Sequence, residues 1–293
     1  MRSSVRRALL LATMAAGSAA VSGAADAPPP LGWYSTSGLS FVMAAGNSRA
    51  STLGARVEVK RLWSRAAFTV AGSAVRADAN DPPRRAVGST GDFQIETGPR
   101  VPKAAKYNAT TAFDRRITDR FGWQTGAEFD RDRFSGLSSR TLGFAGVSYL
   151  LANRKDFALK TGLAATVAHQ SEFVDDPATK NTFAGLRLSA DAERKLGANS
   201  TYVGGLAIDE NLGDTADARV RFANALAVSM SKRLALQVGL LLLYDHQPSL
   251  VELPLFDAGG TPKGLSVAAP AATLDTTFTV SVVVSFAPRA EAP

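Results

Sequence analysis

Apolar and polar residues alternate along most of the chain after about residue 35. The alternation comes in segments of about 10–14 residues, separated by Gly, Pro, Asn, Asp and Ser. A repeat of two residues is that of a β-strand whose two faces meet different surroundings. Helical periodicity is nearly absent, so the pattern predicts an all-β protein. The twelve segments are 36–45, 50–62, 66–76, 105–117, 120–132, 140–151, 156–168, 182–194, 200–210, 219–230, 233–245 and 274–286.

Several segments have one apolar and one polar face. In 50–62, the apolar face carries Leu53, Ala55, Val57 and Val59, and the polar face carries Thr52, Arg56, Glu58 and Lys60. In 120–132, the acidic residues Glu128, Asp130 and Asp132 lie opposite Ala127 and Phe129. The segments 182–194 and 274–286 alternate in the same way. Around Gly143–Leu150 both faces carry small or apolar residues, and the alternation there assigns neither face.

The connections between segments differ in length in a regular way. Every second connection has about two to five residues, such as Ser231-Lys232, and most of the others are longer. The longest are 77–104 and 246–273, which are rich in Gly and Pro, while 46–49 is a short exception. Short turns at one rim and long loops at the other, with strands of this length, are typical of outer-membrane β-barrels.

Aromatic residues fall into two bands along the predicted strands. If the N-terminus starts at the short-turn rim, one band lies near that rim and the other near the loop rim, as at the two interfaces of a membrane. The first band contains Trp63, Phe121, Trp123, Phe157, Tyr202 and Phe286, and the second contains Tyr107, Phe129, Phe222 and Tyr244.

The first 25 residues have the composition of a secretory signal peptide. Arg2, Arg6 and Arg7 precede a short apolar run, and small residues up to Ala25 offer a cleavage site. Their removal lowers the formal net charge from +7 to +4, because they carry three Arg and no acid. This mild charge is dispersed, so binding of nucleic acid is not implied. The chain contains no Cys, and no later stretch has the ~18 continuous apolar residues of a membrane helix.

These features predict an antiparallel transmembrane β-barrel of about twelve strands, with short periplasmic turns and longer extracellular loops. The alternative is a secreted β-sandwich, whose strands average about 5–6 residues. In a membrane barrel the apolar rows face lipid and the charged rows face the lumen. The predicted organisation is a removed leader at 1–25, a lead-in at 26–35, the barrel at 36–287 and a tail at 288–293.

Two stretches of the chain resemble a known family. The first is the turn Gly46-Asn47-Ser48, and the second runs from Phe129 through Asp130-Arg131-Asp132-Arg133-Phe134-Ser135-Gly136-Leu137 to Arg140 and the strand ending in Tyr149-Leu150. Both are similar to motifs of the salt-induced outer membrane proteins, the domain of unknown function 481 (DUF481) family. The resemblance implies a β-barrel in the outer membrane of a Gram-negative bacterium and leaves the molecular activity undefined.

The inward-facing charges are the main candidates for a functional site. Glu128, Asp130 and Asp132 could form a ring that attracts cations or a metal site, but we favour a network of salt bridges within the lumen, because unpaired buried charges are costly. No metal site and no cofactor are predicted. The predicted network consists of Arg56, Glu58, Lys60, Lys106, Arg116, Glu128, Asp130, Asp132, Arg187, Asp191, Glu193, Arg219 and Arg221.

The two histidines support an alternative function. His169, in the sequence His169-Gln170-Ser171, and His246 both lie at predicted strand ends on the loop rim. A histidine there could activate a hydroxyl group or a water molecule in an outer-membrane lipid or peptide hydrolase. The leading hypothesis is instead a non-enzymatic barrel, either structural or a narrow channel for small solutes, and possible induction by salt or stress is implied by the family alone.

The expected partners follow from the location. Outer-membrane lipids and lipopolysaccharide would surround the barrel, and Arg84, Arg85, Arg100 and Lys103 of the loop 77–104 could contact lipopolysaccharide phosphates. Phe286, near the end of the last apolar strand, matches the terminal aromatic signal that the barrel-insertion machinery reads.

Overall fold

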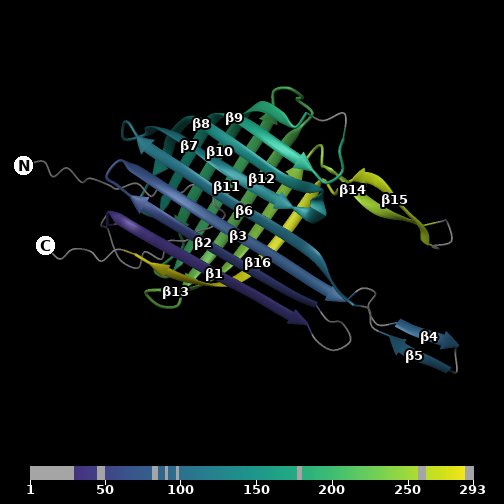
Figure 1. Ribbon diagram of the computed structural model, residues 1–293. Coiled ribbons are helices and arrows are strands. Elements are labelled where there is room, and N and C mark those ends of the chain that lie inside the picture. The colour runs from purple at the N-terminus through teal and green to yellow at the C-terminus, as the bar shows by residue number, and fades with distance from the viewer. Residues whose placement is uncertain are drawn as a thin grey trace, which may run out of the picture.

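The protein is an all-β barrel that closes on itself. A computed structural model describes residues 30–44, 50–80, 85–89, 92–96, 99–176, 180–256 and 262–287. Twelve antiparallel strands form the closed wall in the order β1-β16-β13-β12-β11-β10-β9-β8-β7-β6-β3-β2 (Figure 1). They are β1 (Gly32–Ala44), β2 (Ala50–Leu62), β3 (Ala66–Asn80), β6 (Arg100–Arg116), β7 (Phe121–Asp132), β8 (Leu137–Asn153), β9 (Phe157–Glu172), β10 (Thr182–Lys195), β11 (Ser200–Asn211), β12 (Ala218–Ser229), β13 (Leu234–Asp245) and β16 (Leu274–Phe286).

The predicted fold class is confirmed, and each of the twelve alternating segments lies in one wall strand. β1 begins at Gly32, four residues before the start that alternation predicts, because Gly32 already pairs with Leu62 at the end of β2. The predicted leader 1–25 and tail 288–293 lie outside the described residues.

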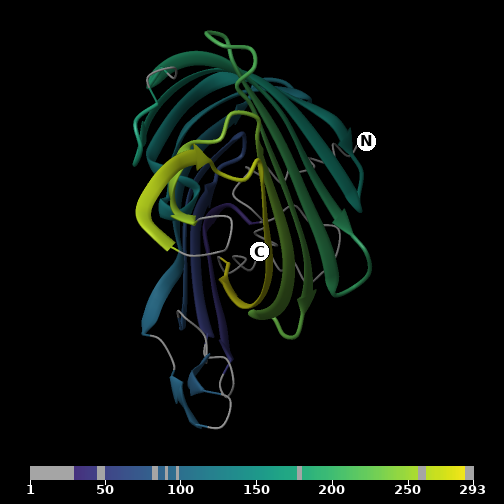
Figure 2. The same ribbon diagram turned by 90° about the vertical axis from the view of Figure 1, so that its right-hand side faces the viewer.

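Two small hairpins lie beyond the loop rim, and the sequence did not predict them. β4 (Arg85–Ser89) pairs with β5 (Asp92–Glu96) within the predicted loop 77–104, and β14 (Leu250–Phe256) pairs with β15 (Pro262–Pro270) within the predicted loop 246–273. Both hairpins project from the rim opposite to the one where β1 begins and β16 ends (Figure 1). Seen from that end, β14–β15 lies at the barrel opening, whereas β4–β5 points away from it (Figure 2).

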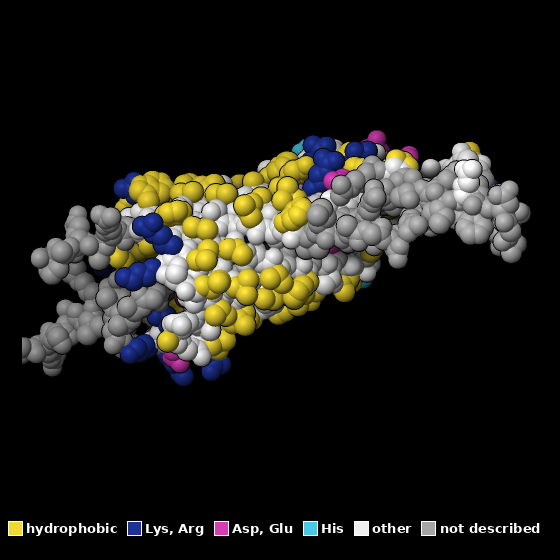
Figure 3. All heavy atoms as spheres, turned by 90° about the horizontal axis from the view of Figure 1, so that it is seen from below, with side chains coloured by type: hydrophobic (Ala, Val, Ile, Leu, Met, Phe, Trp, Pro, Cys, Tyr) yellow, Lys and Arg dark blue, Asp and Glu magenta, His cyan; other side chains and the backbone are white. Residues whose placement is uncertain are grey.

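The outer wall is apolar and the inner wall is polar. Leu53, Val57, Leu188 and Phe278 are each more than 40% exposed, although they belong to the most regular part of the sheet. Hydrophobic side chains cover the middle of the wall, and Lys and Arg gather toward its two ends (Figure 3). In water this surface would be strongly unfavourable, whereas a closed barrel in lipid satisfies its backbone hydrogen bonds and keeps apolar groups in an apolar medium. None of the helical turns among the described residues has the length and apolar character needed to cross a membrane.

Aromatic and cationic side chains meet at the short-turn rim. The Arg61 guanidinium lies 5.1 Å from the ring centre of Trp33 and 5.0 Å from that of Trp63, and Arg233 lies 5.6 Å from the ring centre of Phe286. Such pairs suit a membrane interface, where the rings lie at the level of the lipid headgroups. Phe286 is the last residue of β16 and is exposed on the outer wall. Its role as an insertion signal stays a prediction.

The ambiguous stretch 143–150 in β8 is assigned by its register. Gly126 of β7 pairs with Phe144 of β8, and a Cβ atom on Gly126 would lie 2.6 Å from the Phe144 ring. The ring therefore occupies the inner side of the wall over Gly126, where the Arg187 guanidinium lies 5.3 Å from its centre. Phe144 thus faces the lumen, whereas Val147 and Tyr149 are exposed on the outside.

The assignment of the two faces predicts different costs for the same substitution. Val57→Arg places a charge on the outer wall near the middle of β2, and we expect it to lower the free energy of unfolding by about 2–4 kcal/mol. Thr52→Arg, on the inner face of the same strand and nearer the loop rim, should cost much less. Urea unfolding of both variants in lipid vesicles measures the difference. Equal costs would contradict the assignment of the faces.

Candidate functional site

The centre of the lumen contains a buried triad of charges from three strands. Arg187 of β10 donates hydrogen bonds from Nη1 and Nη2 to the two carboxylate oxygens of Glu128 on β7, at 2.6 and 3.0 Å. The same guanidinium donates from Nε and Nη2 to Asp209 on β11, at 2.7 and 2.9 Å. Arg187 and Asp209 are direct cross-strand partners, whereas Glu128 reaches Arg187 across the lumen. Two bidentate contacts fix the guanidinium plane, and such geometry makes strong, directional pairs.

A second triad lies toward the short-turn rim. The Lys160 ammonium of β9 donates to Asp114 of β6 at 3.0 Å and lies 3.8 Å from Asp191 of β10. All three residues are buried, and Asp114 is only 1% exposed. Lys160 pairs with both carboxylates, so its removal would leave two like charges in a poorly solvated space without the cation that lies closest to them.

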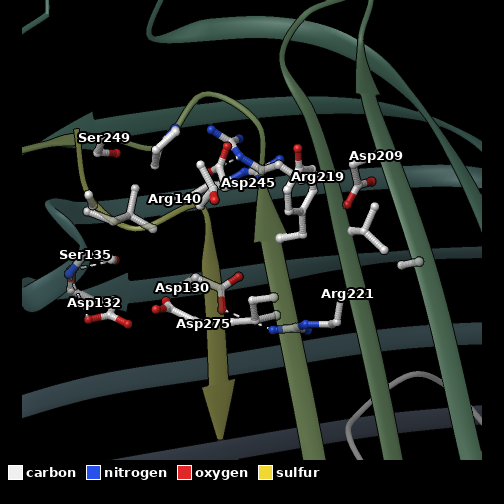
Figure 4. A pocket seen from close by; sticks show the side chains of 18 of the residues that line it. Asp130, Asp132, Ser135, Arg140, Asp209, Arg219, Arg221, Asp245, Ser249 and Asp275 are labelled. Carbon is white, nitrogen blue, oxygen red and sulfur yellow. Dashed lines mark hydrogen bonds and ion pairs between the residues drawn. The ribbon is translucent and has the colours of Figure 1, made fainter.

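Four further ion pairs lie at the loop-rim mouth. Lys106 Nζ lies 3.1 Å from Asp132, and Arg221 Nη2 lies 3.4 Å from Asp130. Arg219 Nε lies 2.7 Å from Asp245, and its Nη2 lies 3.5 Å from Asp217. Figure 4 shows the Arg219–Asp245 pair beside Arg140 and the Arg221–Asp130 pair below them.

The remaining residues of the predicted network lie in the half of the barrel nearer the short turns. Arg56 Nη2 lies 4.0 Å from Glu58 on β2, and Lys60 follows on the same inner face. Glu193 lies on the inner face of β10, two residues from Asp191. Arg116 ends β6 and donates from Nη2 to the Ser64 carbonyl at 3.2 Å, so it holds a short turn.

Sequence reasoning missed seven charged residues of the lumen. Five of them belong to ion pairs, namely Asp114, Lys160, Asp209, Asp217 and Asp245, and the other two are Arg140 and Asp275. Lys160 and Asp275 lie between residues that are Ala, Gly or Thr two positions away, so the alternation has little contrast there. Parity within a strand was the available signal for Asp114, since it lies two residues before Arg116, which was predicted to face inward.

The loop that follows β7 closes part of the mouth. Asp132 caps the 3-10 turn η1 (Arg133–Ser135) by accepting hydrogen bonds from the backbone N–H groups of Phe134 and Ser135. Gly136 ends the turn at φ +79°, and a Cβ atom there would lie 2.5 Å from the Leu250 carbonyl oxygen. A positive φ of this size favours glycine at this position. Its lack of a side chain also lets the base of the β14–β15 hairpin approach closely.

The base of that hairpin is held over the lumen. Ser249 Oγ donates to Glu172 at 3.0 Å, and the Ala271 N–H donates to the Ser249 carbonyl at 3.0 Å. The segments around Ser249 and Ala271 therefore form one side of the mouth, beside Ser135 of η1.

The two histidines lie away from the lumen charges. His169 is on the outer face of β9, where its Nδ1 lies 2.8 Å from Thr182 Oγ1, and Ser171 is exposed on the same face. His246 Nδ1 lies 2.9 Å from the Tyr244 hydroxyl. None of these histidines or Ser171 lines the three cavities described below. In the described part of the chain, no three His, Asp or Glu side chains cluster as metal ligands.

The basic residues proposed to meet lipopolysaccharide are placed only in part. Arg84 lies outside the described residues, Arg85 begins β4, and Arg100 and Lys103 lie in β6. Contact with lipopolysaccharide stays a prediction.

Three cavities that share lining residues follow one another through the lumen, and the first of them borders the Glu128–Arg187–Asp209 triad. The mouth cavity, of about 140 Å³, lies among Lys106, Asp132, Arg140, Arg219 and Asp275. The middle cavity, of about 330 Å³, shares Lys106, Asp132, Arg221 and Asp275 with it. The lower cavity, of about 160 Å³, shares Arg56, Ser73 and Thr277 with the middle one and extends to Thr36 and Val283, near the short-turn ends of β1 and β16.

Many of the side chains that line the lower cavity are small. The lining comes from β1, β2, β3, β12, β13 and β16, and its small residues include Gly38, Ser40, Gly54, Ser73, Gly239, Thr279 and Ser281. The charged triads come mainly from β6, β7, β9, β10 and β11. The barrel interior is therefore asymmetric. Salt bridges fill most of the side formed by β6, β7, β9, β10 and β11, where a cavity of about 40 Å³ remains, and the side formed by β1, β2, β3, β13 and β16 is left hollow.

A closed antiparallel barrel with an apolar outer wall, a charged lumen and longer loops at one rim defines the class of transmembrane β-barrels of the outer-membrane type. Within this class, the family model described as "Protein of unknown function, DUF481" matches residues 37–252, well over half of the chain. The chain therefore belongs to the DUF481 family, and the predicted membership is confirmed. The match does not bear on induction by salt.

Solved structures with a similar shape are porins and other outer-membrane barrels. The KdgM porin in complex with disordered oligogalacturonate is 7% identical, with 86% of this chain and 99% of that chain covered and a TM-score of 0.42. The NanC porin is 10% identical, with 86% and 97% covered and a TM-score of 0.42. The anion-selective porin from Comamonas acidovorans is 12% identical, with 88% and 99% covered and a TM-score of 0.36. Similarities this low carry no argument about solutes. Among curated proteins, no sequence matches the chain.

Proposed function

We propose that the protein is a non-enzymatic channel in the outer membrane of a Gram-negative bacterium and conducts small hydrophilic solutes along the hollow side of its lumen. The observation that carries this proposal is the sequence of three cavities that share lining residues from the loop-rim mouth to near the short-turn rim. Barrels of this size can be filled by side chains or can leave a limited lumen. Here the small residues of β1–β3, β13 and β16 leave space that the salt bridges do not fill.

The salt bridges give the channel wall its shape. Since Arg187 and Lys160 are each held by two carboxylates, the charged side of the lumen is rigid and does not collapse into the hollow side. Solutes would enter among the network charges that line the mouth cavity and would then pass beside the buried triads. The hydrolase alternative has no such support, because neither His169 nor His246 lines these cavities.

A plug in the hollow side tests the proposal. Ser73 lines both the middle and the lower cavity, so Ser73→Trp should lower the single-channel conductance of the purified protein in planar bilayers severalfold. Ala74→Trp is the matched control. Ala74 is on the outer face of the same strand, so the ring of the introduced Trp would enter lipid. An absence of conductance in the native protein would favour a purely structural barrel. Unchanged conductance in Ser73→Trp would place the path elsewhere.

The family resemblance adds a regulatory element to this proposal. We expect more of the protein in the outer membrane after growth at raised NaCl concentration, and quantitative immunoblotting of outer-membrane fractions measures this.

A further inference from the structure

Two charged side chains that line the mouth cavity, one cationic and one anionic, have no partner in the salt-bridge network. Its lining includes five cations, of which Lys106, Arg187, Arg219 and Arg221 each have a carboxylate partner within 4 Å. Arg140 has no ion pair within the described residues, and neither has Asp275. Both line this cavity, and Asp275 also lines the middle cavity below it.

The unpaired guanidinium is accompanied by a second donor. Arg140 Nε is buried and has no hydrogen-bond partner among the described residues, and the same is true of Arg219 Nη1. The aromatic neighbour of Arg140 is the ring of Phe183, whose centre lies 6.0 Å away. Figure 4 shows Arg140 and Arg219 together at one end of the cavity, on either side of Asp245, while Asp275 lies lower, beside Asp130. Buried donors without acceptors are costly, so this end of the cavity favours a ligand with carboxylate-like oxygens.

The balance of charge argues against a simple anion. The carboxylates that line the mouth cavity, Glu128, Asp130, Asp132, Asp209, Asp245 and Asp275, outnumber its five cations by one. A free anion would meet a slightly negative surround, and a free cation would leave the two guanidinium donors unfilled. A solute with a carboxylate at one end and an ammonium group at the other matches both leftover charges and adds no net charge to the cavity.

The cavity is also of suitable size and character. Its volume of about 140 Å³ gives room for a molecule of the size of a small amino acid, and Leu142, Leu243 and Tyr244 supply apolar wall beside the charges. Ligand sites commonly combine such apolar walls with a few placed polar groups.

We propose that the mouth cavity binds small zwitterionic solutes, with the carboxylate on Arg140 and Arg219 and the ammonium group toward Asp275. This inference rests on the proposed channel, since the site lies at its entrance, but binding can be measured without conduction.

Isothermal titration calorimetry of the refolded barrel in detergent tests the site with three probes of similar size, namely β-alanine, propionate and n-propylammonium. We expect β-alanine to bind saturably and about tenfold more tightly than either ion, as expected for losing one hydrogen-bonded charge contact. Arg140→Gln and Asp275→Asn should each weaken β-alanine by about the same factor. The Asp275→Asn variant should also bind propionate and β-alanine with about equal affinity.

The controls are exposed residues of the same rim. Arg133→Gln in η1 and Asp175→Asn after β9 change the same charges without touching the cavity and should bind β-alanine as the native protein does. Gel mobility before and after heating shows whether each variant is folded, and Arg140→Lys, which keeps the charge but not the fork of donors, should bind with intermediate affinity.

The outcomes separate the site from the channel. Tight propionate binding by the native protein would overturn the zwitterion and leave an anion site, and no saturable binding of β-alanine would overturn the site altogether. Folded Arg140→Gln that binds β-alanine normally would also overturn it. Saturable binding without conductance would support the site and refute the channel. Conductance without binding would support the channel and refute the site.

Discussion

Lys160→Met is expected to lower the free energy of unfolding by about 3–5 kcal/mol, the range observed when one partner of a buried ion pair is removed. Lys160 lies within 4 Å of both Asp114 and Asp191. Without it the two carboxylates would lie close together in a buried site, where their repulsion is only weakly screened. Urea unfolding in lipid vesicles, followed by tryptophan fluorescence, measures the loss.

Two comparisons make this result specific. Lys232→Met, in the exposed turn between β12 and β13, removes the same charge and should change stability by no more than about 0.5 kcal/mol. Asp114→Asn and Asp191→Asn introduced together with Lys160→Met should recover part of the loss, because no uncompensated charge then remains buried. If Lys160→Met were as stable as the native protein, lumen water would have to solvate this triad well. That result would contradict the role of the triad as a rigid part of the wall.

Replacing Glu128, Asp130 and Asp132 together with their amides is expected to lower the melting temperature of the barrel and to shift its ion preference toward anions. Arg187 would keep only Asp209, while Arg221 and Lys106 would lose the partners that lie at 3.4 and 3.1 Å. The bidentate Glu128–Arg187 pair is well buried and should account for most of the loss, about 3 kcal/mol. The two partly exposed pairs should add at most about 1 kcal/mol each, because water screens them.

The same triple variant separates two roles of these acids. Gel-shift melting reports stability, and the reversal potential in a salt gradient reports selectivity. If the acids form a cation-attracting ring along the path and not a network, the variant should lose cation preference with no change in melting temperature. Asp119→Asn, Asp156→Asn and Asp175→Asn together remove the same net charge from exposed turns and loops, and should leave melting unchanged. An unchanged melting temperature of the lumen variant would refute the network, and an unchanged reversal potential would refute the ring.

The histidines illustrate a limit of reading motifs along the chain. His169 and Ser171 are two residues apart, so on a strand they share a face, and the alternation of β9 places that face outside. The tripeptide His169-Gln170-Ser171 alone does not show whether its histidine and serine face the lumen or the outer wall. The neighbouring position, Gln170, faces inward and is almost fully buried.

Local features of the chain were enough to predict the wall of the barrel. Segment length, two-residue alternation, the spacing of turns and the aromatic bands are local properties, and they predicted all twelve strands and the inward direction of Glu128, Asp130, Asp132 and Arg187. The alternation failed where both faces carry small or apolar residues, as in 143–150, and in the loops, where β4–β5 and β14–β15 form. Cross-strand pairing decides those places, and a pairing partner is not visible in the residues of one strand.

The tertiary structure alone decided which charges meet and where space remains. Glu128 and Arg187 are 59 residues apart and lie on strands separated in the wall by two others, so their contact depends on how far each strand is staggered when the sheet closes. The same closure brings the charges of β6, β7, β9, β10 and β11 together and leaves the small residues of β1, β2, β3, β13 and β16 opposite them. Alternation tells which side chains point inward, but closure and stagger determine what each meets across the lumen. For that reason Arg140 and Asp275, left unpaired at the mouth, could be recognised only in the folded barrel.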